Sequence, residues 1–268
     1  MKKALLILII YLSGLIPAYA QDCKIAQMRQ LTEKYMSAQK AGDPQLLPLY
    51  NTLFIENLAV IDVSRSILNE VLPITFSRTF YDKNNCMSLS EIIVDDRFAS
   101  YVMNVRLYIV DDKVTKIDSI ITTDGDWEFD AKEFQKASES EKWNALSGAE
   151  YLEREEIFKI ADAYLNNFTY ENVKVAWGSI CAHLEGGLKY TGNDTYPSCK
   201  LNMPGDPIEI VERDYFIDED AGVVNIFCRF GKTNTESRFG ATRGLPDSHT
   251  FRIATGKIRY IHSITVVN

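Results

Sequence analysis

After its first twenty residues the chain has no apolar run long enough to cross a bilayer, which takes about 20 residues. It also lacks a cluster of basic residues: 29 Lys and Arg stand against 37 Asp and Glu, a formal net charge of −8. Because phosphate binding needs clustered cations, we expect neither nucleic acid nor a membrane as a partner. The expected partner is a small molecule.

The motifs of the commonest cofactor and hydrolase sites are missing as well. There is no Gly-x-Ser-x-Gly elbow, no phosphate-binding loop and no dinucleotide fingerprint. No CxxC pair or paired Cys/His spacing indicates zinc. The sequence therefore predicts no metal and no cofactor, and it disfavours the common hydrolases.

The first twenty residues have the pattern of a secretory signal peptide. Lys2 and Lys3 precede a mostly apolar stretch over residues 4–17, and Ala18-Tyr19-Ala20 is typical of a cleavage site before Gln21. Cleavage there would leave a mature chain with a formal charge of −10, 27 minus 37. The pattern predicts a secreted, extracellular protein.

Five cysteines follow this segment, and an odd number in an oxidising compartment indicates two disulfides and one free thiol. Pairing within each half would join Cys23 to Cys86 and Cys181 to Cys199, although spacing alone leaves other pairings open. Cys228 would then remain in an apolar strand, where a free thiol behaves as a small hydrophobic side chain.

The chain repeats itself. Residues 107–122 align without a gap to residues 251–266, and both read as alternating strands around a tight turn, at Asp111-Asp112 and Thr255-Gly256. These two segments predict two hairpins.

The starts of the two halves also match. Residues 31–36 and 160–165 have helical apolar spacing, and at the same offset residues 54–57 align with residues 183–186. Each half reads as a long helix, a short helical region and several antiparallel strands that end in a hairpin. We expect an α+β tandem duplication of a cone-shaped, curved antiparallel sheet packed on helices.

Residues 124–152 separate the repeats. They contain Trp127 and Trp143 among charged residues, whereas a flexible linker would be rich in Gly and Ser. We therefore expect a signal peptide over 1–20, an N-terminal domain over 21–123, a linker that packs on both halves, and a C-terminal domain over 153–268. A site between the halves, near the start of the linker, is one alternative.

Several short motifs carry a resemblance, in this order along the chain: residues 38–42 (AQKAG), 113–121 (KVTKIDSII), 124–127 (DGDW), 177–178 (WG), 184–187 (LEGG), 246–249 (PDSH) and 256–262 (GKIRYIH). In these the chain resembles a group of secreted fungal proteins with two SnoaL-like, or nuclear transport factor 2-like, domains in tandem. His183 departs from the Arg of that group. The resemblance implies the fold and secretion but no established chemistry.

The superfamily that this fold implies includes cofactor-free dehydratases, isomerases and cyclases as well as binding modules, so fold alone does not choose the function. Such domains often dimerise through their open sheet faces. Here the tandem copies would make that contact internally, so we expect a monomer.

All three histidines, His183, His249 and His262, lie in the C-terminal half, which makes it the better candidate for proton-transfer chemistry. Glu185 lies where related enzymes project a carboxylate base, and partial burial would raise its pKa. His249 is placed like the oxyanion donor of related isomerases. We predict Glu185 and His249 as catalytic residues.

Six further residues are predicted to contact the substrate. Strand alternation places Tyr260 and His262 on one apolar face, and it places Asp214 with Phe216 on one face and Tyr215 on the other. Either of these two faces would be the interior one. The predicted substrate-binding residues are Tyr164, His183, Asp214, Phe216, Tyr260 and His262.

Each of these residues also has a structural interpretation. Glu185 would hold the Gly186-Gly187 turn, His249 would fix a loop to the sheet, His262 would be a core or interface histidine, and Tyr164 would be core, since Tyr35 repeats it.

Two sequons, at Asn167 and Asn193, are predicted glycosylation sites. The predicted function is a secreted, cofactor-independent lyase, dehydratase or isomerase of a small oxygenated substrate, such as a sugar derivative or a secondary metabolite. The alternative is a non-catalytic binding or interaction protein.

Overall fold

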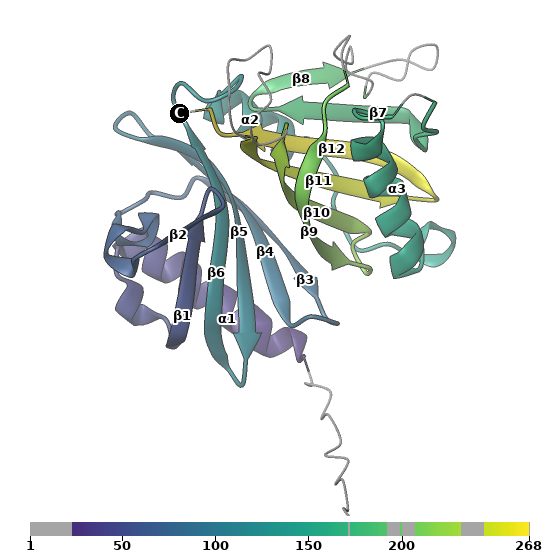
Figure 1. Cartoon of the computed structure of the whole chain (residues 1–268). Coiled ribbons are helices and arrows are strands. Elements are labelled where there is room, and N and C mark those ends of the chain that lie inside the picture. The colour runs from purple at the N-terminus through teal and green to yellow at the C-terminus, as the bar shows by residue number, and fades with distance from the viewer. Residues whose placement is uncertain (1–22, 171, 192–198, 200–206, 232–243, 268) are drawn as a thin grey trace, which may run out of the picture.

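A computed structural model describes residues 23–170, 172–191, 199, 207–231 and 244–267 (Figure 1). The predicted signal peptide and the sequon at Asn193 lie outside these residues. The described chain is an α+β structure with two six-stranded sheets and three α-helices, arranged as two similar halves in tandem.

The N-terminal half begins with α1 (Ile25–Ala41), which contains the predicted helical repeat and ends at Gly42 in the left-handed conformation. Its sheet and short 3₁₀ helices are η1 (Pro44–Leu46), β1 (Leu49–Glu56), β2 (Ala59–Ile61), η2 (Val63–Arg65), η3 (Ile67–Asn69), β3 (Phe76–Asp82), β4 (Met87–Asp95), β5 (Ser100–Val110) and β6 (Lys113–Thr123).

The segment between the halves forms α2 (Ala131–Glu139) and η4 (Gly148–Glu150). The C-terminal half then repeats the order of the first: α3 (Arg154–Asn166), β7 (Trp177–Glu185), β8 (Leu188–Thr191), β9 (Ile210–Asp218), β10 (Val223–Phe230), β11 (Leu245–Ala254) and β12 (Lys257–Thr265). The two predicted hairpins are β5–β6 and β11–β12.

Both sheets are mixed, which corrects the expectation of purely antiparallel sheets. Their strand orders are β2-β1-β6-β5-β4-β3 and β8-β7-β12-β11-β10-β9. The first long strand of each half pairs in parallel with the last, β1 with β6 and β7 with β12. Hairpins can be predicted from local sequence, but no local turn indicates the pairing of strands whose register partners lie 63 residues apart, as Phe54 and Ile117 do, or 78 apart, as His183 and Ile261 do.

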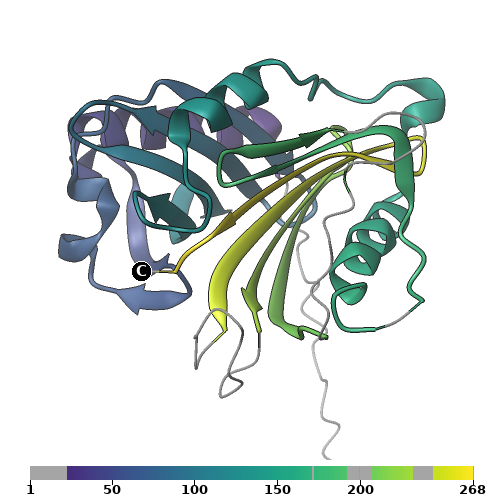
Figure 2. The same ribbon diagram turned by 90° about the horizontal axis from the view of Figure 1, so that it is seen from above.

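One face of each sheet packs on the long helix of its own half. The N-terminal core joins α1 to side chains such as Met103, Val105 and Leu107, and the C-terminal core joins α3 to side chains such as Ile226, Phe251 and Ile261. Helices α1 and α3 therefore lie on opposite outer sides of the molecule, with the two sheets between them (Figure 2).

The other faces of the two sheets pack on each other. Arg106 on β5 is fully buried there: its Nε donates to Asn225 Oδ1 on β10 at 2.9 Å, and its guanidinium lies 3.8 Å from the ring centre of Phe227. Because both faces of the central strands are covered, β4 and β10 are apolar or buried almost throughout rather than alternating.

The segment between the halves packs on both of them. Phe134 of α2 is buried in a cluster that contains Ile93 and Val102 of the first sheet and Leu184 and Ile264 of the second. Trp143 belongs to a further cluster between the halves, with Phe80 and Phe216.

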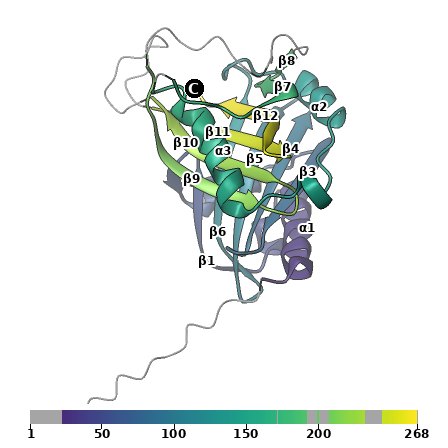
Figure 3. The same ribbon diagram turned by 90° about the vertical axis from the view of Figure 1, so that its right-hand side faces the viewer.

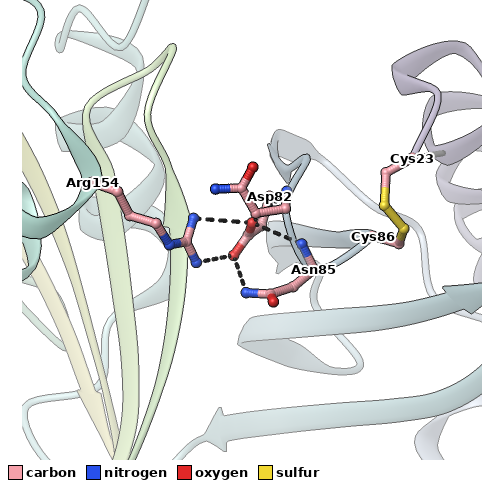
Figure 4. The surroundings of a disulfide bond; sticks show 6 residues. Cys23, Asp82, Asn85, Cys86 and Arg154 are labelled. Atoms are coloured by element: carbon pink, nitrogen blue, oxygen red, sulfur yellow. Dashed lines mark hydrogen bonds and ion pairs between the residues drawn. A yellow bond between two sulfur atoms is a disulfide. The ribbon is translucent and has the colours of Figure 1, made fainter. Parts of the chain in front are cut away.

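Two disulfides join Cys23 to Cys86 and Cys181 to Cys199, as predicted for pairing within each half, and Cys228 is a buried free thiol. Next to the first disulfide, Arg154 of α3 donates to both carboxylate oxygens of Asp82, at 3.1 and 2.7 Å (Figure 4). Asn85 Nδ2 donates to the same carboxylate at 2.9 Å. The disulfide and the ion pair together hold the β3–β4 turn to both halves.

None of the helices within the described residues is both long and apolar enough to cross a membrane. The two disulfides fit a protein that folds in an oxidising compartment.

Candidate functional site

The candidate site lies on the face of the C-terminal sheet that α3 crosses (Figure 3). Its centre is a lateral row on three neighbouring strands: Glu185 of β7 is the register partner of Ser263 on β12, and Ser263 is the partner of His249 on β11. Register partners project to the same face of a sheet. Glu185, the predicted base, and His249, the predicted oxyanion donor, therefore project to the same face from β7 and β11, with β12 between them.

Two adjacent rows add further polar groups. On one side, His183 lies opposite Ile261, two residues before Glu185. On the other side, Cys228 of β10 is the partner of Asp247 on β11. With Tyr164 from α3 these residues form what we term the C-terminal polar cluster: Tyr164, His183, Glu185, Cys228, Asp247 and His249.

Glu185 is partly buried at the end of β7, and its Oε1 accepts a 2.9 Å hydrogen bond from Trp127 Nε1 of the linker. Burial is the main cause that raises the pKa of Glu185 to about 7, and the nearby Asp247 carboxylate adds to it, whereas His249 opposes the shift. A carboxyl group with this pKa can both accept and release a proton near neutral pH.

Gly186, which follows Glu185, allows a left-handed backbone conformation and a close approach of the linker. Gly186 has φ of +63°, and a Cβ at this position would clash with the backbone of Trp127 and Glu128. The close approach of the linker explains this glycine, and the hydrogen bond of the Glu185 side chain is to Trp127 of that linker.

Asp247 and His249 face each other along β11, with Oδ1 2.8 Å from His249 Nδ1. Both side chains are almost fully buried, at 1% and 3% exposure. The second carboxylate oxygen of Asp247 accepts a 3.0 Å hydrogen bond from Thr265 Oγ1, which fixes its orientation. Asp247 and His249 are thus in direct contact, although the contact lacks hydrogen-bond geometry.

Tyr164 and His183 each bring a fully buried polar atom that has no hydrogen-bond partner among the described residues: the phenol oxygen of Tyr164 and Nδ1 of His183. The two rings are in edge contact, 6.1 Å between centres, and the Tyr164 ring also lies 5.7 Å from that of His249. His183 Nε2 pairs with Ser263 Oγ at 2.9 Å. Burial of an unpaired polar atom costs about 1–3 kcal/mol, so these atoms need a role other than stability.

The remaining member of the polar cluster, Cys228, is fully buried. Burial, with the Asp247 carboxylate as a smaller cause, raises the pKa of its thiol well above the ordinary value. On its own this thiol stays protonated and is a poor nucleophile.

The N-terminal half shows what the fold requires at these positions. Strand register places Phe54 where the C-terminal half has His183, and Ile92 where it has Cys228. In the same way Met103 and Val105 replace Asp247 and His249, and all four apolar residues lie in the core against α1.

The tyrosine of the polar cluster has an equivalent whose hydroxyl is satisfied: Tyr35 Oη donates to Gln39 Oε1 at 3.1 Å. The glutamate is likewise repeated as Glu56, which accepts from Ser66 Oγ at 2.8 Å and from the Ile67 amide at 2.9 Å. The fold therefore forms without the polar cluster.

Phe216 and Asp214 do not lie in this cluster, and their predicted place in the interior is wrong. Phe216 is buried between the halves, with Trp143. Asp214 is half exposed on the same face, with Oδ2 3.3 Å from Arg106 Nη1. Tyr215 is the residue that faces the α3 side, the alternative that alternation left open.

Tyr260 and His262 also face the other half, which corrects their predicted place. The register of β12 shifts between Ile258 and Tyr260, so Ile258 joins the core under α3 while Tyr260 stacks on Trp143. His262 is fully buried between Glu91 and Glu141, at 2.7 Å from each. Alternation failed here because of this irregularity and because both faces of β12 are covered.

Asn167, the predicted glycosylation site inside the described residues, caps the end of α3 and is partly buried. The hydroxyl of its sequon residue, Thr169, donates to the Ile208 carbonyl oxygen at 2.8 Å.

Comparison with known protein families finds a similarity in the C-terminal half. Residues 150–265 match a family described as a domain of unknown function (DUF8021). The matched region includes every member of the polar cluster. No curated protein matches the chain.

Proposed function

We propose that the C-terminal half is a secreted lyase, dehydratase or isomerase that moves protons on a small oxygenated substrate, such as a sugar derivative or a secondary metabolite. We further propose that each half is a SnoaL-like, or nuclear transport factor 2-like, domain. The observation that carries the proposal is the polar cluster itself, since the equivalent positions of the N-terminal half are mostly apolar.

The proposed chemistry assigns Glu185 as the base. It removes a proton from the carbon beside a carbonyl group, and the electron pair moves onto the carbonyl oxygen. Its pKa of about 7 supports this role because the carboxylate is available near neutral pH and its conjugate acid can return the proton.

The developing oxyanion needs hydrogen-bond donors in a buried setting, where they act strongly. The Tyr164 hydroxyl is one such donor, since it has no partner among the described residues. His249, in contact with the Asp247 carboxylate, is the other. When the electron pair returns from the oxygen, a dehydratase expels the β-hydroxyl group, which takes the proton held by Glu185 and leaves as water. An isomerase of a β,γ-unsaturated carbonyl compound instead returns that proton from Glu185 to the γ-carbon.

The test begins with a search for ligands. Thermal unfolding of the mature chain is measured with a panel of sugars, uronic acids, phenolics and terpenoids, because a ligand that binds only the folded state raises the melting temperature. Each ligand found is then incubated with the protein in D₂O, and loss of its C–H signals is followed by NMR. We expect exchange or turnover with the wild-type protein.

The matched variants are Glu185→Gln and Glu56→Gln, which make the same change at equivalent positions of the two halves. Glu185→Gln should lower the exchange rate at least 100-fold, within the range of general base catalysis, and Glu56→Gln should leave it unchanged. A ligand that binds without exchange or turnover would favour the alternative of a binding protein.

A further inference from the structure

Three buried side chains of the polar cluster have the composition of a metal site. One ligand-type atom from each of Cys228, Asp247 and His249, a sulfur, a carboxylate oxygen and an imidazole nitrogen, lies within 4.8 Å of the other two. In a tetrahedral zinc site, bond lengths of about 2.0–2.3 Å separate such atoms by roughly 3.3–3.7 Å. Small side-chain rotations would bring the three atoms to that spacing.

One carboxylate oxygen of Asp247 and one ring nitrogen of His249 lack hydrogen-bond partners among the described residues. Asp247 Oδ1 and His249 Nδ1 are 2.8 Å apart, yet neither has a partner in hydrogen-bond geometry among the described residues. Both residues are more than nine-tenths buried. A cation that both atoms face would satisfy them together.

Asp247 also has a hydrogen bond of the kind that orients metal-binding carboxylates. Asp247 Oδ2 is held by Thr265 Oγ1 at 3.0 Å, which leaves Oδ1 for a further partner. Hydrogen bonds of this type orient the carboxylates that bind metals and are a regular part of such sites.

The repeat gives an independent argument. At the places of Cys228, Asp247 and His249 the N-terminal half has Ile92, Met103 and Val105, which belong to its hydrophobic core. The three candidate ligands therefore differ together from the residues that the same fold carries when these positions only pack.

We propose that Cys228, Asp247 and His249 bind one Zn²⁺ ion. Thiolate, imidazole and carboxylate are all zinc ligands, and three protein ligands leave a fourth position for water or a substrate oxygen, the arrangement of catalytic zinc sites. With the ion bound, the metal would stabilise the oxyanion in place of His249. The binding itself does not depend on the proposed reaction.

The test measures metal in the mature chain without an affinity tag. The protein is expressed with its disulfides, incubated with Zn²⁺, freed of excess metal by gel filtration and assayed by mass spectrometry of the elements. Titration with Co²⁺ then reports a thiolate ligand through its charge-transfer absorption. We expect one equivalent of zinc and a charge-transfer band that zinc abolishes.

The variants are Cys228→Ser and His249→Val, with His183→Phe as the control, because it removes a buried histidine of the same cluster that is not a proposed ligand. Cys228→Ser should lose the band, both ligand variants should bind zinc at least tenfold more weakly, and the control should match the wild type. Thermal unfolding checks that each variant is folded.

Less than a tenth of an equivalent of zinc in the wild-type protein would overturn the proposal, and so would equal affinity in a folded Cys228→Ser variant. Such a result would leave the proton-transfer proposal standing, since that proposal is tested by Glu185→Gln and hydrogen exchange.

Discussion

The imidazole of His262 and the carboxylate of Glu91 meet across the two halves of the molecule, with Nδ1 2.7 Å from Oε2. On its other side, His262 Nε2 lies 2.7 Å from Glu141 of the linker. Arg78 pairs with Glu91 at 2.6 Å, and Lys189 with Glu141 at 3.3 Å. One buried histidine thus joins three parts of the chain through charge.

The ionic contacts of His262 with Glu91 and Glu141 depend on pH because each requires a charged histidine and a charged carboxylate. Burial alone would lower the pKa of His262, but Glu91 and Glu141 more than offset this and raise it above 6.5. Its stabilisation is then complete below pH 6.5 and is lost as the pH rises through the raised pKa. We expect the free energy of unfolding, measured in urea, to fall as the pH rises above neutrality.

At acidic pH, the stability depends on the protonation of Glu91, the carboxylate partner of His262. Burial alone would raise the pKa of Glu91, but His262 and Arg78 more than offset it and lower the pKa from 4.5 to about 2. The stabilisation that ionised Glu91 provides is lost as the pH falls from about 4.5 towards 2. A His262→Gln variant should lose about 3 kcal/mol at pH 6 and show a flatter alkaline limb. An unchanged alkaline slope in that variant would contradict the assignment.

A second prediction concerns how much the ionised Glu185 side chain lowers the free energy of unfolding. Because its pKa is raised from 4.5 to about 7, the ionised side chain destabilises the fold increasingly between these pH values and fully above them. Glu185→Gln should therefore stabilise the protein by about 2–3 kcal/mol at pH 8 and by little at pH 4.5.

Urea unfolding at the two pH values measures this difference. Glu155→Gln is the control, because Glu155 is an exposed residue whose change should stay within about 0.5 kcal/mol. Equal effects of Glu185→Gln at both pH values would show that the carboxyl is not perturbed.

A third prediction exchanges residues between the halves. His183→Phe introduces the residue of the N-terminal half and removes a buried nitrogen that has no partner among the described residues. Because the change also breaks the hydrogen bond between His183 Nε2 and the buried Ser263 Oγ, we expect the two effects to offset each other and the unfolding free energy to change by less than about 1 kcal/mol. The reverse change, Phe54→His, should destabilise by about 3 kcal/mol because it buries an unpaired polar group in a hydrophobic core. A loss of more than about 1 kcal/mol in His183→Phe would mean that the histidine is structural.

The sequence predicts the parts of this fold that are local or repeated. The two hairpins, the long helices and both disulfides follow from alternation, helical spacing and cysteine pairing within each half. These predictions rest on residues close in sequence or on the internal alignment. Glu185 and His249 are predicted instead from the resemblance to related enzymes, and the structure places them with Tyr164 on the α3 side of the C-terminal sheet.

The errors arise where tertiary contacts override local pattern. Alternation assigns Tyr260 and His262 to the wrong face because the register of β12 shifts after Ile258 and because the sheet is covered on both faces. The zinc ligands proposed above have no motif, since Cys228 stands on one strand and Asp247 and His249 on its neighbour. Only strand register brings them together.

The last prediction compares the two disulfides. Cys23–Cys86 closes a sequence separation of 63 residues and Cys181–Cys199 one of 18. In the chain-entropy treatment, the longer loop stabilises by about 4 kcal/mol and the shorter by about 3 kcal/mol. Replacing each pair by two alanines should therefore cost about 1 kcal/mol more for Cys23 and Cys86. Urea unfolding of the two double variants measures the difference. A larger loss for the shorter loop would show that Cys181–Cys199 contributes through the folded state, beside the polar cluster, rather than through the unfolded chain.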